Sequence, residues 1–119
     1  MSDQFNHGHA LLIGVDQNQV ERWALPDVAK DVAALRDVLV HPKRCAYPAD
    51  NVKVLTGPEA TRNGILDGLA WLQERIEGEE GDNTTALVYY TGHGLHEGSA
   101  SSGTFYLVPY DIREGRIAS

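Results

Sequence analysis

The stretch TALVYYTGHG, residues 85–94, decides how the rest of the sequence is interpreted. Residues 85–90 are rich in β-branched and aromatic side chains, a composition typical of a β-strand. This strand runs into Gly92-His93-Gly94, and the two glycines allow the backbone to turn tightly on either side of the histidine. We therefore expect a strand that ends immediately before a histidine.

Two strands and a helix are expected in the first half of the chain. Residues 9–15 (HALLIGV) form a short apolar run, as in a strand buried on both faces of a parallel sheet. Residues 52–55 form a second strand between turn residues. A helix should run between them, opened by Pro26 and ended by Pro42. Its apolar stripe consists of Val28, Val32, Leu35 and Leu39.

A second amphipathic helix should begin at Thr61, a suitable N-cap, and end before the polar turn at residues 79–83. We expect its apolar face to cover the sheet. That face consists of Ile65, Leu69, Leu72 and Ile76. Strand, helix, strand, helix, strand is the resulting order. It predicts a three-layer α/β fold with a mainly parallel central sheet flanked by helices.

We divide the chain into a loose N-terminal arm, residues 1–8, and one domain, residues 9–119. A further strand is expected over residues 104–108, in a hairpin with the segment near Arg116 and Ile117. No helix follows that could cover this strand. We therefore expect the fold to be incomplete at the C-terminus, with an exposed sheet edge.

Composition argues against several classes of partner. The net charge of −7 disfavours binding to a nucleic-acid backbone, which needs a concentrated basic face. The longest apolar stretches, residues 10–13 and 86–90, are too short to cross a bilayer, and the N-terminus lacks a signal segment. A single cysteine, Cys45, cannot form an internal disulfide. We expect a cytoplasmic protein with no nucleic-acid or membrane partner.

The histidines outside the 85–94 stretch are not expected to bind a metal. His7 and His9 have no further ligand at a supporting spacing, so we expect two solvated side chains near a flexible end. His96 follows His93 by three residues, but on a loop without an accompanying cysteine or well-placed acid. A solvated or substrate-side histidine is the preferred interpretation there.

His93 is the strongest candidate for chemistry. In open parallel sheets, ligands gather where strands reach their carboxyl ends, and His93 is expected at such an end. Imidazole, with an ordinary pKa of about 6.5, exchanges protons near neutral pH. Gly94 can present an unobstructed N–H toward a developing oxyanion. The small, flexible residues 98–103 (GSASSG) suit a mobile loop at the mouth of such a site.

Four segments resemble the caspase-like cysteine proteases of clan CD (peptidase family C14), most closely metacaspases and bacterial caspase homologues. They are in register over residues 9–117: HALLIGV, LPDVAKDVAAL, EATRNGIL and VYYTGHG. VYYTGHG is the most specific, because it is similar to the catalytic-histidine signature of the family. FYLVPYD, residues 105–111, is similar to the strand that usually follows it.

The resemblance implies that His93 is the catalytic histidine and that the Gly94 N–H contributes to an oxyanion hole. In the family mechanism a cysteine thiolate attacks a peptide carbonyl, the histidine helps to protonate the leaving amine, and water releases the acyl-enzyme. Neither a metal nor an organic cofactor takes part. Calcium dependence, known among metacaspases, is left open by the resemblance, with no visible site for the ion.

The nucleophile of the family is missing here. Relatives carry it at the end of the next core strand, in a pattern similar to Asp-x-Cys-His/Gln-x-Gly, which this sequence lacks. Cys45 lies where the family has no nucleophile, and we expect a buried or half-buried loop residue. We therefore expect a second segment or chain to supply the cysteine for a peptide substrate, and this polypeptide alone to be inactive. The alternative is a non-catalytic pseudoprotease that binds partners through the same surface.

Specificity is the last inference from the resemblance. Caspases hold an aspartate with an arginine after the first strand, but Leu25 occupies that position here. Metacaspases cut after lysine or arginine with acidic pocket residues, and Asp16 or Asp27 could serve in this way. Asp27 suits the N-terminus of a helix better, and Asp31 is expected to be structural. An unrelated flavodoxin-like domain is disfavoured, because the sequence has no glycine-rich phosphate loop.

Overall fold

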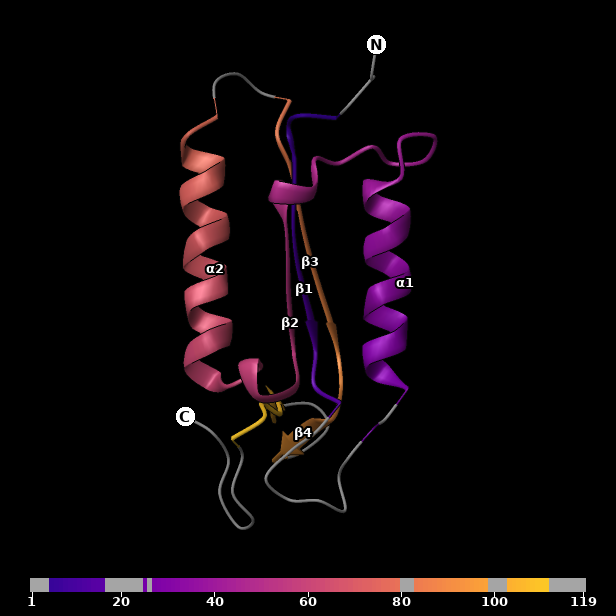
Figure 1. Ribbon diagram of the computed structural model, residues 1–119. Helices are drawn as coiled ribbons and strands as arrows, with labels where there is room; N and C mark the ends of the chain where they lie inside the picture. The colour runs from indigo at the N-terminus through magenta and orange to yellow at the C-terminus, as the bar shows by residue number, and fades with distance from the viewer. Residues whose placement is uncertain (1–4, 17–24, 26, 80–82, 99–102, 112–119) are drawn as a thin grey trace.

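The computed structural model describes residues 5–16, 25, 27–79, 83–98 and 103–111. Three parallel strands form a sheet in the order β2-β1-β3, with helix α1 on one face and helix α2 on the other (Figure 1). The strands are β1 (Gly8–Gly14), β2 (Val52–Thr56) and β3 (Thr85–Thr91), and the helices are α1 (Val28–Val40) and α2 (Arg62–Glu77). The predicted α/β fold with helices on both faces of a parallel sheet is confirmed.

β1 is the central strand, and all seven of its residues are buried. It pairs with β2 from Ala10 opposite Val52 onward and with β3 from Gly8 opposite Thr85 onward. Both of its faces are covered by a helix, so neither face can carry a polar side chain in contact with water. This burial explains why the strand reads as a continuous apolar run.

Two separate hydrophobic clusters fill the spaces between the sheet and the helices. Alternate residues of β1 point to opposite faces. The cluster on the α1 side contains Ala10, Leu12, Val32, Leu39, Tyr47 and Val52. The cluster on the α2 side contains Leu11, Ile13, Val15, Leu55, Ala60 and Leu72. Each helix is therefore held by its own set of contacts with the central strand.

The face of helix α2 that meets the sheet differs from the predicted one at Leu69. Leu69, expected on the covering face, is 41% exposed, whereas Gly68 is buried. A Cβ atom at Gly68 would lie 2.9 Å from a methyl group of Leu11 and 3.2 Å from one of Leu55. The glycine therefore permits close approach, and the helix turns Leu69 away from the sheet. The predicted N-cap is confirmed, because the Thr61 hydroxyl accepts a hydrogen bond from the Gly64 N–H at 3.0 Å.

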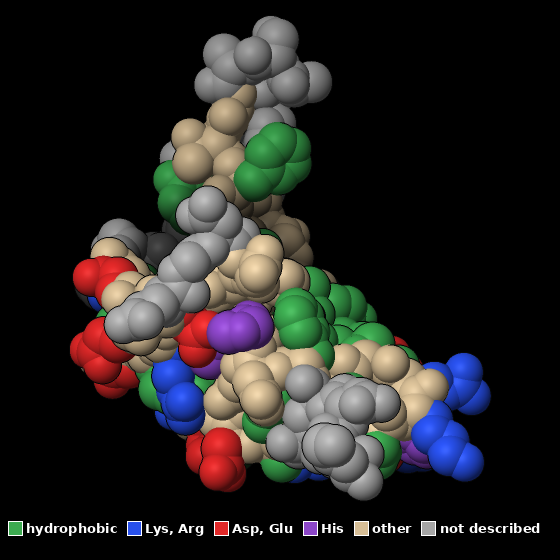
Figure 2. Space-filling model, turned by 90° about the horizontal axis from the view of Figure 1, so that it is seen from above, with side chains coloured by type: hydrophobic (Ala, Val, Ile, Leu, Met, Phe, Trp, Pro, Cys, Tyr) green, Lys and Arg blue, Asp and Glu red, His purple; other side chains and the backbone are tan. Residues whose placement is uncertain are grey.

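A two-stranded antiparallel hairpin follows the sheet. It is formed by β4 (Gly94–Glu97) and β5 (Thr104–Leu107), with Gly94 opposite Leu107. His96, expected on a loop, is in β4, and the predicted partner segment near residues 116–117 lies outside the described residues. The hairpin extends away from the sheet, is visible as the projection in Figure 2, and includes Phe105, which is 77% exposed.

The last residues of the predicted arm pack on the domain. Residues 1–4 lie outside the described part, but the Phe5 ring meets the Tyr47 ring edge to face at a centroid distance of 5.5 Å. The Phe5 N–H also donates to the Ala46 carbonyl at 2.7 Å. In the part of the chain that the structure describes, neither helix has the length and apolarity needed to cross a membrane.

Candidate functional site

His93 lies just beyond the carboxyl end of β3, next to the end of the central strand. The register places Gly14 of β1 opposite Thr91 of β3, and the Val15 N–H donates to the Thr91 carbonyl at 2.9 Å. Residues 92–93 then connect β3 to β4, and His93 is half-buried. A histidine here is carried by a strand that is fixed in the sheet and is not sealed in the core.

The Tyr90 side chain contacts the His93 backbone. Its phenolic oxygen lies 2.7 Å from the His93 carbonyl oxygen. The same oxygen lies 2.9 Å from the carbonyl oxygen of Val108 and 3.1 Å from the Val108 nitrogen. The Val108 N–H also donates to the His93 carbonyl at 3.1 Å. Tyr90 was not among the predicted site residues. The sequence feature that could have identified it is its position three residues before His93 in the same motif.

Burial keeps the Tyr90 phenol protonated. Its ring packs against the α2-side cluster, and desolvation raises the pKa of Tyr90 above its ordinary value of 10.0. The hydrogen bond from the Val108 backbone opposes this shift only in part. The hydroxyl is therefore a hydrogen-bond donor at neutral pH.

Gly92 is required because Tyr90 occupies the space that a side chain would need. A Cβ at this position would lie 2.8 Å from the Tyr90 hydroxyl oxygen and 3.1 Å from Cβ of Val15. The Gly92 φ of +157° also lies in a region that residues with a side chain rarely adopt. Gly92 thus leaves the space that the Tyr90 side chain occupies.

Gly94 begins β4 and is exposed. Because His93 and Val108 are joined by a backbone hydrogen bond, the next pair along the ladder, Gly94 and Leu107, is of the non-hydrogen-bonded type. In such a pair the N–H groups point away from the partner strand. The Gly94 N–H is therefore directed away from β5.

Asp16 lies at the same edge of the sheet, just after β1, and is half-buried. Its Oδ1 accepts a hydrogen bond from the Gly57 N–H at 2.9 Å, and its carbonyl accepts one from the Leu25 N–H at 2.7 Å. Gly57 follows β2 with a φ of +57°. The carboxylate thus joins the ends of β1 and β2.

Asp27 is exposed and precedes the first residue of α1. It occupies the N-cap position without a side-chain cap hydrogen bond, and its carbonyl accepts from the Asp31 N–H at 3.2 Å. Asp31 is exposed in the first turn. Both acids therefore lie where the helix dipole favours negative charge, the position that was expected for Asp27.

Cys45 is at the opposite end of the molecule and is exposed, so the expectation of a buried or half-buried thiol is wrong. Its loop, residues 41–48, follows α1 at the amino end of the sheet, whereas β4 begins at the carboxyl end (Figure 1). A strand of seven residues such as β1 spans roughly 20 Å. The thiol is out of reach of His93.

His7 and His9 contact a carboxylate at this amino end; His7 is exposed, as expected, but the expectation of a solvated side chain is wrong for His9. His9 is 2% exposed, and its Nε2 lies 3.3 Å from Oε1 of Glu79. His7 contacts the other oxygen of the same carboxylate through Nδ1. Figure 2 looks onto this end and shows a histidine beside an acidic side chain. Among the described residues, no group of three or more His, Cys, Asp or Glu side chains is arranged to hold a metal ion.

The ion pair shifts the titration of Glu79. The hydrogen bond with His7 lowers the pKa of Glu79 below its ordinary value of 4.5, and the contact with His9 acts in the same direction. Desolvation opposes this shift without overcoming it. The cluster therefore favours the ionised carboxylate.

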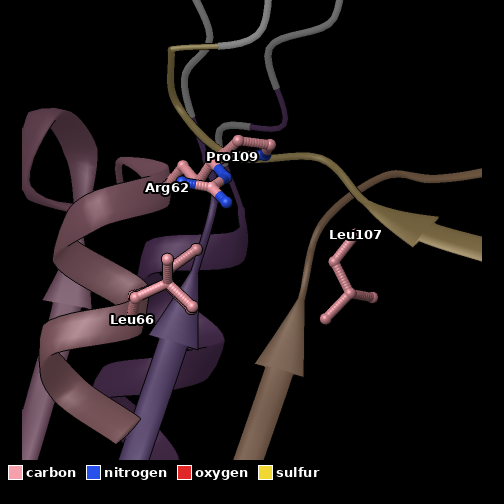
Figure 3. Close-up of a pocket in the computed structure, with 5 residues that line it drawn as sticks. Arg62, Leu66, Leu107 and Pro109 are labelled. Atoms are coloured by element: carbon pink, nitrogen blue, oxygen red, sulfur yellow. The ribbon is translucent and has the colours of Figure 1, made fainter. Parts of the chain in front are cut away.

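A hollow of about 100 Å³ lies between the start of α2 and the hairpin. Figure 3 shows Leu66 on α2 and Leu107 on β5 on its two sides, with Arg62 and Pro109 beyond them. Asp111 fixes this region, because its Oδ1 accepts a hydrogen bond from the Arg62 N–H at 2.9 Å. The segment after β5 is thereby tied to the N-terminus of α2.

Comparison with protein families gives one result that covers almost the whole chain. A model of the caspase domain, Peptidase C14, matches residues 7–117. A search of curated proteins found no match. The match includes the strand β3, the histidine after it and the hairpin. Sequence match and parallel α/β architecture agree, and the chain belongs to the caspase domain family of peptidases.

Proposed function

We propose that this chain is the histidine-bearing part of a caspase-like cysteine endopeptidase whose nucleophile comes from a segment or chain outside it. The observation that carries the proposal is the position of His93, directly after β3 at the carboxyl edge of a caspase-domain sheet. In parallel sheets this edge is where substrates and reacting groups meet.

The proposed reaction uses side chains, backbone amides and water. A cysteine thiolate attacks the carbonyl carbon of the scissile peptide, and the Gly94 N–H stabilises the negative charge that develops on the carbonyl oxygen. As the C–N bond breaks, the His93 imidazolium gives its proton to the leaving nitrogen. Water then attacks the carbonyl carbon of the thioester while His93 accepts a proton from that water; the C–S bond breaks, the cysteine thiolate is restored and the acid product leaves.

β3 offers a place for the missing strand. It is an edge of the three-stranded sheet formed by the described residues. A parallel strand added beside it would end next to His93 and could present a cysteine there. The face of β3 and α2 at this edge is apolar and uncovered, since Val88, Leu66 and Leu69 are 50%, 46% and 41% exposed. Exposed apolar surface of this kind suits a further packed element.

Asp16 is the better candidate for a substrate pocket that takes a basic side chain. Its position is set by the Gly57 N–H, and it is half-buried at the same edge of the sheet as His93. Asp27 is exposed at the start of α1, where the helix itself accounts for its charge. Asp16→Asn should weaken cleavage after Lys or Arg. Asp27→Asn should weaken it less.

A pseudoprotease that binds partners through this surface is the second candidate. The observation that favours it is the position of Cys45, the single cysteine of the chain, at the end of the sheet remote from His93.

An exposed thiol that is not paired within the chain suits a reducing, cytoplasmic environment.

Covalent labelling of the native protein tests both candidates. Peptide electrophiles bearing Asp, Arg or Lys are added, and the modified residue is identified by mass spectrometry. Labelling of a cysteine outside this chain, lost in His93→Ala and kept in Cys45→Ser, supports the protease. A native protein with no cysteine-bearing companion and no labelling by any probe supports the pseudoprotease. Labelling that survives His93→Ala refutes the assignment of His93.

A further inference from the structure

The peptide between His93 and Gly94 joins the two groups on which the proposed chemistry depends. The carbonyl of His93 and the N–H of Gly94 belong to one planar trans peptide, so they point in opposite directions. A contact that holds the carbonyl therefore also sets the direction of the N–H. The carbonyl lies 2.7 Å from the Tyr90 hydroxyl and 3.1 Å from the Val108 nitrogen.

The Tyr90 hydroxyl can donate one hydrogen bond and accept others, as its contacts with His93 and Val108 require. A phenol carries one proton and can also accept hydrogen bonds. The shortest of its contacts is with the His93 carbonyl, to which it donates, and it accepts from the Val108 N–H at 3.1 Å. The carbonyl of Val108, at 2.9 Å, is the other acceptor within reach. The hydroxyl thus joins the turn after β3 to the end of β5.

The ring that carries the hydroxyl is itself held in place. It packs in the α2-side cluster, and Gly92 lies against its outer end, where an added Cβ would be 3.1 Å from Cζ. Tyr90 is also part of β3, which is paired with the central strand along its length. The position of the hydroxyl is therefore set mainly by the core packing of the ring and by the pairing of β3 with β1.

We propose that Tyr90 is a positioning residue, whose hydroxyl holds the His93–Gly94 peptide so that the imidazole and the Gly94 N–H are presented together. The catalytic consequence rests on the proposed function. The structural part does not, because it concerns groups within this chain. Burial, which raises the pKa of Tyr90, keeps the donor proton on the hydroxyl throughout the neutral range.

Tyr90→Phe removes the hydroxyl and keeps the ring. Tyr89→Phe is the matched control, since the Tyr89 ring packs on the α1 side of the sheet. In NMR spectra of the protein, the Gly94 amide nitrogen should shift in Tyr90→Phe and stay within the range of the control, because the polarisation of a carbonyl is transmitted across its peptide. A Gly94 resonance that moves no more than in Tyr89→Phe overturns the proposal.

Hydrogen exchange of the unmodified protein is a second test that does not depend on any variant. The Val108 amide faces His93 and Tyr90, whereas the Leu107 amide belongs to a non-hydrogen-bonded pair. Exchange at Val108 should therefore be at least tenfold slower than at Leu107, as a rough expectation for a hydrogen-bonded amide. Equal exchange rates would show that the linkage does not persist in solution and would overturn the proposal.

Measurements of kcat and KM, made on the protein together with its cysteine-bearing part, distinguish a positioning role of Tyr90 from a contribution to stability alone. Removing one oxyanion donor costs about 10²- to 10³-fold in kcat, so a misdirected donor should cost roughly tenfold with KM nearly unchanged. Tyr89→Phe should leave both constants unchanged. A shifted Gly94 resonance with unchanged kcat overturns the positioning role. An inactive unmodified protein overturns the proposed function, and the NMR comparison then decides the structural part alone.

Discussion

The two ends of the sheet both carry histidines, but the surrounding structure uses them differently. At the amino end, His9 is 2% exposed and lies with His7 against Glu79. At the carboxyl end, His93 is half-buried on a turn whose backbone is held by Tyr90. The amino-end histidines contact a carboxylate of the fold, whereas the carboxyl-end histidine lies on a turn at the edge of the sheet where we propose that a substrate approaches. Position relative to the sheet, more than residue type, therefore separates the histidines that pack on a carboxylate from the one that we propose to be catalytic.

The largest expected effect is on activity at the carboxyl end. His93→Ala should reduce kcat/KM for peptide cleavage by the cysteine-containing protein about 10²- to 10⁴-fold, the usual contribution of a general acid and base. His7→Ala, at the amino end, should leave kcat/KM unchanged. Steady-state cleavage of a fluorogenic peptide measures both. Equal losses in the two variants would remove the distinction between the two ends.

The next effect is on stability at the carboxyl end. Gly92→Ala should lower the free energy of unfolding by about 1–3 kcal/mol, because the new methyl group meets the Tyr90 hydroxyl and the backbone is strained. Urea denaturation measures the change. Gly78→Ala is the control, since a Cβ there would come no closer than 3.5 Å to the atoms around it. A loss of similar size at Gly78 would contradict the explanation.

The next smaller effect concerns the N-terminus of α2, which lies at the same end of the molecule as His93. Thr61→Ala should destabilise the protein by about 0.5–2 kcal/mol, because the Gly64 N–H loses its side-chain acceptor at the helix N-terminus. Thr61→Ser keeps the hydroxyl oxygen and should restore most of the loss. The midpoint of urea denaturation is the measurement. Two variants of equal stability would show that the cap contributes little.

The smallest expected effect is pH-dependent and lies at the amino end. The contact with His7 lowers the pKa of Glu79, so its contribution to stability is present above the ordinary value of 4.5 and is lost as pH falls through the lowered value. Glu79→Gln should therefore lower the thermal midpoint near pH 6 and approach the unmodified protein in acid. A gap between the two proteins that stays constant from neutral to acid pH would contradict the assignment.

The elements that sequence reasoning predicted correctly depend on short-range patterns. The apolar run of β1, the N-cap at Thr61 and the strand before His93 are each visible within a few neighbouring residues. The errors involve residues whose environment is made by distant segments. Leu69 is exposed because α2 meets Leu11 of β1 with Gly68 instead, and His9 is buried where Glu79, just after α2, lies against it.

The candidate site divides in the same way. His93, Gly94 and Asp16 were identified by the motif and by their positions after strands, and their functional roles stay predictions. Tyr90 was missed, although it is only three residues from His93, because its contact with Val108 joins residues 18 apart. A tyrosine in a strand rich in β-branched and aromatic residues is most simply a packing residue, and the partner of its hydroxyl cannot be inferred from neighbouring residues.

The order of strands and helices, the parallel sheet and the place of His93 after the last strand of that sheet all follow from the amino-acid sequence. Periodicity, caps and turn residues act over a few positions, so the chain carries this information locally. Other features are visible only in the folded chain. Tyr90 and Val108 hold the His93 backbone, and Glu79 contacts His7 and His9. The loop with Cys45 lies at the other end of the sheet from His93. These contacts depend on how the layers pack, and packing brings together residues whose separation along the chain carries no signal.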